Sequence, residues 1–130
     1  MAVIDASVWI ARFKTDDKFH EQAKHLIQSL IANQETINVP TIAFIEVAGA
    51  IKRTTKNDNT ARKSVLNMKD TELEVFADFG EWEPIATEIA IKQSIKGADA
   101  CYLAVAQITR SNLYTFDKQQ QEAFDAINTW

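Results

Sequence analysis

Short apolar runs alternate with longer segments of helical spacing along this chain, and this alternation limits the fold more than any other feature of the sequence. Ala2–Ile4 is an apolar run that ends at an acid, and Thr36–Val39 and Leu113–Phe116 have the same strand-like character. Strands that alternate with helices build parallel sheets with helices on both faces. We therefore expect an α/β fold of three layers, α/β/α, around a central parallel sheet.

The segments between these runs predict helices from their apolar stripes and from the residues at their ends. Ser7 is a suitable N-cap for the first helix, and Pro40 suits the start of the third. The predicted helices span residues 8–13, 18–32, 41–53, 60–68, 87–94, 98–109 and 118–127. Glu72–Ile85 is less regular. A short strand there would bring the sheet to four, within an expected range of four to five short strands.

Composition fits one globular unit over residues 1–130. The chain is 46% hydrophobic and 25% charged, with only 3 Gly and 2 Pro, which excludes a disordered or low-complexity chain. Its single cysteine, Cys101, excludes an internal disulfide and a cysteine-based zinc site. No apolar run approaches the roughly 20 residues that span a bilayer, and the acid at position 5 comes too early for a signal peptide. We therefore expect a cytoplasmic protein with no membrane partner.

The charge balance does not identify a partner. The chain has 14 Lys and Arg against 18 Asp and Glu, a formal net charge of −4, which argues weakly against a simple nucleic-acid binder. If four of the acids are metal ligands, however, the remaining acids balance the bases.

Glu46 is the acid that most needs an explanation. It is the only charged residue between Pro40 and Lys52, in a predicted helix that is otherwise apolar. A carboxylate buried there costs several kcal/mol unless it finds a cation or a proton. The alternative is a surface glutamate on the one exposed stripe of the helix, and we favour the functional interpretation because charged residues are rarely buried without a partner.

Three further acids occupy positions with ordinary structural explanations. Asp99 stands at the head of the second strongly apolar helix, where it could be an N-cap, and Asp117 begins a capping-box pattern with Gln120. Asp5 ends a strand, where a loop aspartate is common. Taken singly, each of these acids is explained equally well by a structural role, such as a helix cap or a loop residue, and by a role in a functional site.

Taken together, these four acids predict a metal site. Asp5 and Asp117 follow parallel strands, so they fall at the edge of the sheet where ligands bind, and Glu46 and Asp99 lie on the two most buried of the predicted helices. Clustered carboxylates raise one another's pKa unless a cation neutralises them. Oxygen ligands without His or Cys select Mg²⁺ or Mn²⁺, and such ions activate water for attack on a phosphodiester.

The same residues carry a resemblance to a known family. The sequence resembles a PIN domain, and within that group a VapC-type toxin ribonuclease of type II toxin–antitoxin systems. The matching motifs lie at residues 3–10, 44–47, 97–104 and 113–117, so they spread over nearly the whole chain. One departure is the helical segment before Asp99, Thr87–Ile95, which is shorter than the family usually has.

The resemblance implies a PIN-like fold and an endoribonuclease that depends on Mg²⁺ or Mn²⁺. Asp5, Glu46, Asp99 and Asp117 would form its acidic cluster, with Ser7 and Thr115 as hydroxyl-bearing supports. It also implies a homodimer and a small VapB-type antitoxin as a partner. Two alternatives within the fold remain: a PIN-like binding module without cleavage, and a housekeeping nuclease without an antitoxin.

Basic residues near these acids are candidates for RNA contacts. A run of them follows the Glu46 helix, and a solvated helix face explains that run slightly better than RNA binding does. The candidates are Arg12, Lys52, Arg53 and Lys56.

Two other acidic-pocket folds fit less well. A receiver domain would have paired acids after the first strand, and a metal-dependent phosphatase would have a second aspartate where this chain has Ser7.

Overall fold

Four short parallel strands form one sheet in the computed structural model, which describes residues 1–77 and 81–128. The strand order is β3–β2–β1–β4, and Val3 pairs with Asn38 on one side and with Leu113 on the other. The strands are β1 (Ala2–Ile4), β2 (Ile37–Pro40), β3 (Leu73–Phe76) and β4 (Asn112–Tyr114). Because every pairing is parallel, all four carboxyl ends lie at one edge. The expected parallel sheet and its number of strands are confirmed.

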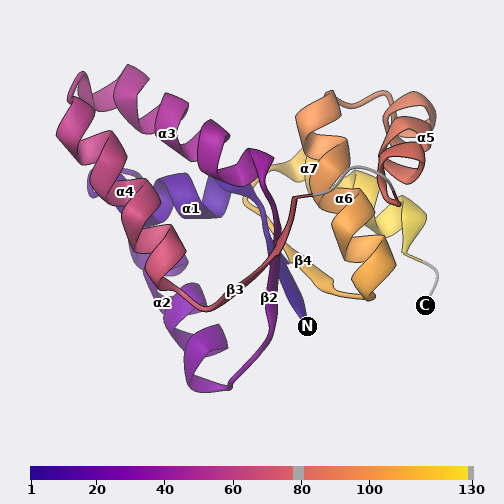
Figure 1. Cartoon of the computed structure of the whole chain (residues 1–130), viewed down its shortest axis with the longest axis horizontal. Coiled ribbons are helices and arrows are strands. Elements are labelled where there is room, and N and C mark those ends of the chain that lie inside the picture. Colours follow the sequence, from indigo (N-terminus) through magenta and orange to yellow (C-terminus); the bar gives the residue numbers. More distant parts are fainter. Residues whose placement is uncertain (78–80, 129–130) are drawn as a thin grey trace.

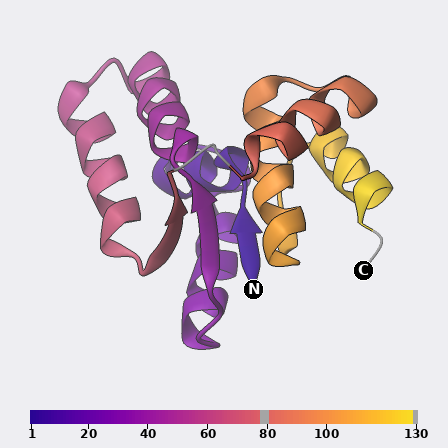
Figure 2. The same cartoon turned by 45° about the vertical axis from the view of Figure 1, so that its right-hand side comes forward.

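Helices cover both faces of this sheet, as the alternating pattern predicts (Figures 1 and 2). In the described residues they are α1 (Ala6–Phe13), α2 (His20–Ala32), α3 (Ile42–Thr55), α4 (Asp58–Asp70), α5 (Glu83–Gln93), α6 (Gly97–Thr109) and α7 (Lys118–Ile127). The helices α1 to α4 lie on one side and α5 to α7 on the other. The fold is therefore the expected three-layer α/β/α arrangement.

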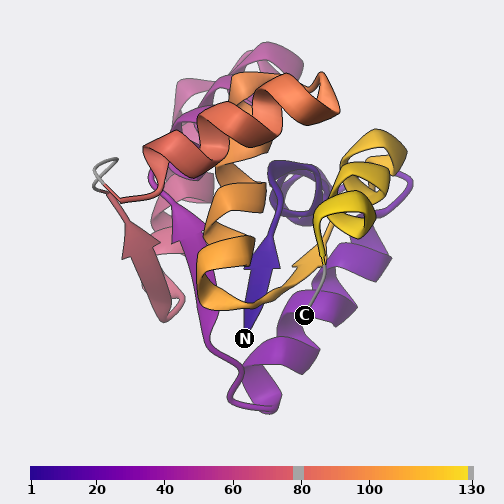
Figure 3. The ribbon, with the colours of Figure 1, turned by 90° about the vertical axis from the view of Figure 1, so that its right-hand side faces the viewer.

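The centre of the core is the contact between β1 and α6. All of β1 is buried, and the apolar run 100–106 of α6 is buried along its whole length. Figure 3 shows α6 crossing the face of the sheet, where it packs on β1, β2 and β4. None of the helices in the described residues is long and apolar enough to cross a membrane.

Several helix ends differ from the sequence-based prediction. The first helix begins at Ala6, so Ser7 lies inside it and the N-cap position falls on Asp5. Ser7 is not a cap because its hydroxyl is used elsewhere, as described below. The helix before Asp99 begins at Glu83 rather than at residue 87, since Pro84 suits a first turn. The helix before Asp99 therefore has 11 residues.

The helix that carries Glu46 is less buried than its composition predicts. Only Ala43, Val47 and Ile51 of α3 are buried, whereas Ile45 is 69% exposed. The reason is that α3 packs through α1 and α4 and extends beyond the sheet (Figure 1). The strand expected within 72–85 is present as β3, while residues 78–80 of that segment lie outside the described residues.

Candidate active site

The four predicted acids come from four different elements at the carboxyl edge of the sheet. Asp5 follows β1 and Asp117 follows β4, while Glu46 and Asp99 lie near the starts of α3 and α6. The Asp99 carboxyl interacts electrostatically with the other three, and Asp5 also interacts with Asp117 and Glu46. Residues spread over more than a hundred positions of sequence therefore share one electrostatic environment.

Asp5 is the most enclosed of these acids, with 3% of its surface exposed. The hydroxyls of Thr115 and Ser7 both donate to its Oδ2, at 2.5 and 3.1 Å. Ser7 Oγ in turn accepts the backbone N–H of Phe116 at 3.0 Å, which ties α1 to the segment after β4. Burial raises the pKa of Asp5, and these hydrogen bonds oppose the rise. The two hydroxyl residues thus hold the carboxylate in place.

Glu46 has a partner that sequence analysis missed. The hydroxyl of Tyr102, from the buried face of α6, donates to Glu46 Oε1 at 2.6 Å. Burial raises the pKa of Glu46, the Tyr102 hydrogen bond lowers it, Asp5 raises it and Lys96 lowers it. Tyr102 was hidden in an unbroken apolar run, but its position three residues after Asp99 places both on one helix face.

Asp99 is not the N-cap that its position suggested. It is the third residue of α6, whose N-cap position is held by Lys96. Its pKa is raised from 3.8 to about 6, first by burial and then by Asp5, Glu46 and Asp117, while Lys96 lowers it. Lys96 is thus a cation close to two of the acids, and it was absent from the sequence-based set.

Asp117 has both a structural and a site position. Its Oδ1 accepts the backbone N–H of Gln120 at 3.0 Å, so it caps α7 as the sequence pattern predicts. The other half of the capping box is wrong, because the Gln120 amide instead donates to the backbone carbonyl of Asp99 at 2.9 Å. Gln120 therefore links the segments of two site acids from a buried position.

The chemistry of this donor set fits a hard divalent cation. It consists of carboxylates with hydroxyl supports. Burial and repulsion from the other acids raise the pKa of Asp99, and a bound cation would relieve that repulsion. In the described residues, however, no group of three or more acidic, histidine or cysteine side chains is arranged to hold a metal ion.

The basic residues that are predicted to contact RNA make local contacts with residues other than the four acids. Lys52 forms an exposed ion pair with Asp58, and the Arg12 guanidinium lies 6.0 Å from the centre of the Phe13 ring. Arg53, near the end of α3, places its guanidinium beside Gly49, one turn beyond Glu46. Lys56 is the C-cap of α3. The contact of these four residues with RNA stays a prediction.

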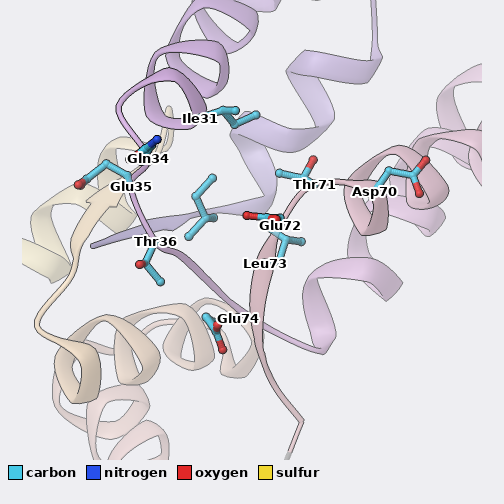
Figure 4. Close-up of a pocket in the computed structure, with 10 residues that line it drawn as sticks. Ile31, Gln34, Glu35, Thr36, Asp70, Thr71, Glu72, Leu73 and Glu74 are labelled. Atoms are coloured by element: carbon cyan, nitrogen blue, oxygen red, sulfur yellow. The ribbon is translucent and has the colours of Figure 1, made fainter.

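Figure 4 shows the residues that line a separate cavity of about 770 Å³. It opens between the starts of β2 and β3, at the amino edge of the sheet. Four acidic side chains line it, namely Glu35, Asp70, Glu72 and Glu74. None of the predicted site residues belongs to it, so cavity size does not locate the site in this fold.

Comparison with known proteins gives a family and a fold. The model of the PIN domain family matches residues 2–125. The solved structure of VapC20 from Mycobacterium tuberculosis, described as a sarcin-ricin loop cleaving toxin, aligns with a TM-score of 0.80 and 21% identity over 95% of each chain. PAE2754 from Pyrobaculum aerophilum aligns with a TM-score of 0.66 and 16% identity over 94% of this chain and 83% of its own. No curated protein matches the sequence significantly.

Proposed function

The chain belongs to the PIN domain family, and we propose that it is an endoribonuclease that uses Mg²⁺ or Mn²⁺ to cut RNA phosphodiesters. PIN domains are nucleases that generally use divalent metal ions. The observation that carries the proposal is the electrostatic coupling of Asp99 to Asp5, Glu46 and Asp117 at the carboxyl edge of the sheet. Such crowding of acids destabilises a protein unless a cation balances it.

In this mechanism the protein holds the reacting groups in position, and no side chain acts as a nucleophile. A divalent ion bound by the acids would lower the pKa of a water and stabilise the charge of the phosphodiester under attack. Ser7 and Thr115 keep the Asp5 carboxylate oriented through its Oδ2, and Tyr102 does the same for Glu46. Lys96 carries a positive charge near Glu46 and Asp99, where the anionic RNA would approach.

We propose further that the chain is the toxin of a VapBC-type pair. The support is the fold it shares with VapC20 over 95% of both chains, together with the motifs around the four acids. A cytoplasmic homodimer inhibited by a small VapB-type antitoxin follows from that proposal. A short upstream reading frame for a DNA-binding protein would support it, and a nuclease gene standing alone would contradict it.

The test of the nuclease proposal is RNA degradation by purified protein. We expect cleavage of single-stranded RNA with Mg²⁺ or Mn²⁺, loss of cleavage in excess EDTA, and its return when either ion is restored. Cleavage that persists at full rate in EDTA would contradict the metal requirement. Binding of RNA without cleavage in either ion would favour the binding-module alternative.

Tyr102→Phe is expected to lower RNA cleavage by about 10- to 100-fold, the usual cost of losing a group that orients a metal ligand. The change removes the hydroxyl that donates to Glu46 and also raises the pKa of Glu46 further, since that hydrogen bond lowers it. The loss should therefore be larger at pH 6 than at pH 8. The measurement is cleavage rate against pH at saturating Mg²⁺.

Tyr114→Phe is the matched control, because Tyr114 is the other tyrosine of the chain and lies on β4. Equal losses in the two variants, or a Tyr102→Phe loss independent of pH, would show that Glu46 does not depend on this hydroxyl.

A further inference from the structure

A small pocket adjoins the acidic site on the side of Asp117. Its volume is about 350 Å³. It is lined by Ser7, Ile10, Asp17, Lys18, Phe19, Phe116 and Asp117. Two of these residues, Ser7 and Asp117, also belong to the candidate active site. The pocket and the acids are therefore parts of one continuous surface.

Two phenylalanine rings from distant parts of the chain meet in this pocket. The centres of the Phe19 and Phe116 rings are 4.7 Å apart, with 23° between their planes. Each ring is only partly buried. Phe116 lies between Thr115 and Asp117, so its backbone is fixed by the same Ser7 contact that serves Asp5. Asp17 holds the other ring by accepting the backbone N–H of Phe19 at 2.8 Å.

The charges around the rings indicate which part of a nucleotide would enter. Asp17 and Asp117 line the pocket, so a phosphate inside it would be repelled. Lys18 lies at the rim, with its Nζ 5.0 Å from the centre of the Phe19 ring, and its side chain is exposed. A neutral aromatic base suits the interior, while a phosphate suits the neighbourhood of Lys18.

We propose that this pocket binds one base of single-stranded RNA, next to the phosphodiester that the acids cut, by contact with Phe19 and Phe116. The proposal rests on the nuclease function proposed above and adds a substrate subsite to it. RNA that is recognised as a single strand presents unstacked bases to aromatic side chains. Because the Phe19 and Phe116 rings stack on each other and Lys18 lies over Phe19, the base would contact the sides of this stack that line the pocket rather than enter between the rings. The pocket is therefore expected to select for an unpaired nucleotide, whichever base that nucleotide carries.

The test compares RNA oligonucleotides that carry one abasic nucleotide at each position in turn. For the wild type, one position beside the cut should lower kcat/KM by about tenfold when its base is missing. Phe116→Leu and Phe19→Leu should each lower kcat/KM on intact RNA by about as much, mainly through KM. In either variant, removing the base at that same position should lower kcat/KM much less than it does in the wild type. The reason is that the ring with which the base interacts is already missing.

Phe44→Leu is the matched control. Phe44 is also partly buried with a lysine over its ring, Lys69 Nζ lying 5.2 Å from its centre, but it does not line the pocket. Its kcat/KM should stay close to that of the wild type. Circular dichroism and melting temperature show whether each variant folds. The Phe19 and Phe116 variants are made separately, so that the test can still be done with one of them if the other unfolds.

The outcomes separate the subsite from the nuclease function. An abasic penalty that is as large in both phenylalanine variants as in the wild type would overturn the subsite while leaving cleavage intact. If the wild type does not cut RNA with Mg²⁺ or Mn²⁺, the proposed function fails. The Asp5→Asn protein then tests the pocket alone by fluorescence anisotropy with the same oligonucleotides, and equal affinity for intact and abasic RNA would overturn it.

Discussion

Asp5→Asn is expected to reduce RNA cleavage by about a thousandfold while the protein stays folded. A metal ion at a phosphodiester contributes several kcal/mol of transition-state stabilisation, and each 1.4 kcal/mol is about a tenfold change in rate. The asparagine keeps the size of Asp5, and its amide oxygen can accept the hydrogen bonds of Ser7 and Thr115 in place of Oδ2. The measurement is single-turnover cleavage with Mg²⁺, together with a thermal melt.

Asp125→Asn is the control for this prediction. It makes the same substitution at an exposed position of α7, where Asp125 accepts a hydrogen bond from the Gln121 amide. Its cleavage rate should equal that of the wild type. An Asp5→Asn protein that cuts RNA at the wild-type rate would show that the catalytic centre lies elsewhere.

Asp99→Asn is expected to stabilise the metal-free protein at pH 7.5 while it also abolishes cleavage. The pKa of Asp99 is raised to about 6 in the folded protein, so its ionised form is disfavoured there and more acceptable in the unfolded chain. The rise corresponds to about 3 kcal/mol for a fully shielded group. Solvent screening of the half-exposed carboxylate reduces the expected gain to about 1 to 2 kcal/mol, or about 5 °C in melting temperature.

The sign of this effect fixes its pH dependence. Between pH 3.8 and about 6 the folded protein binds a proton at Asp99 that the unfolded chain has lost. The contribution of Asp99 to wild-type stability is therefore full below this window and lost as the pH rises through it. The advantage of Asp99→Asn in EDTA should accordingly grow from pH 4 to pH 7. An advantage of the same size at both pH values would contradict the raised pKa.

The same variant also tests whether the acids share an ion. Mg²⁺ should raise the melting temperature of the wild type more than that of Asp99→Asn, because binding to the folded state alone adds stability. Cleavage by the wild type should fall as the pH drops through about 6, since protons then compete with the ion for Asp99. Equal Mg²⁺ shifts in the two proteins would argue against a common site.

The parallel sheet could be predicted because its signals are local. Ala2–Ile4 and the 100–106 run are apolar without interruption, and both are at the centre of the core. Glu46 was identified by the same logic, as a charge in an apolar helix. The burial predicted for the rest of α3 is wrong, and Ile45 is exposed. An apolar composition does not tell which faces of a helix its neighbours will cover.

The groups that position the acids were harder to find. Tyr102 donates to Glu46 across 56 positions of sequence, and Gln120 donates to the Asp99 carbonyl across 21. Each has a sufficient local explanation, as a core aromatic or as part of a helix cap. Their contacts depend on how α3, α6 and α7 are placed relative to one another, and no short pattern encodes that placement. Ser7 and Thr115 were named only because the family resemblance implied them.

The hydrogen bond between Thr115 and Asp5 spans 110 residues, and it has a consequence for how the candidate site assembles. Asp5 follows β1 and Thr115 follows β4, so this contact forms only once these two strands have paired. A fragment that lacks the segment after β4 would therefore be missing both the hydroxyl that orients Asp5 and the Asp117 carboxylate.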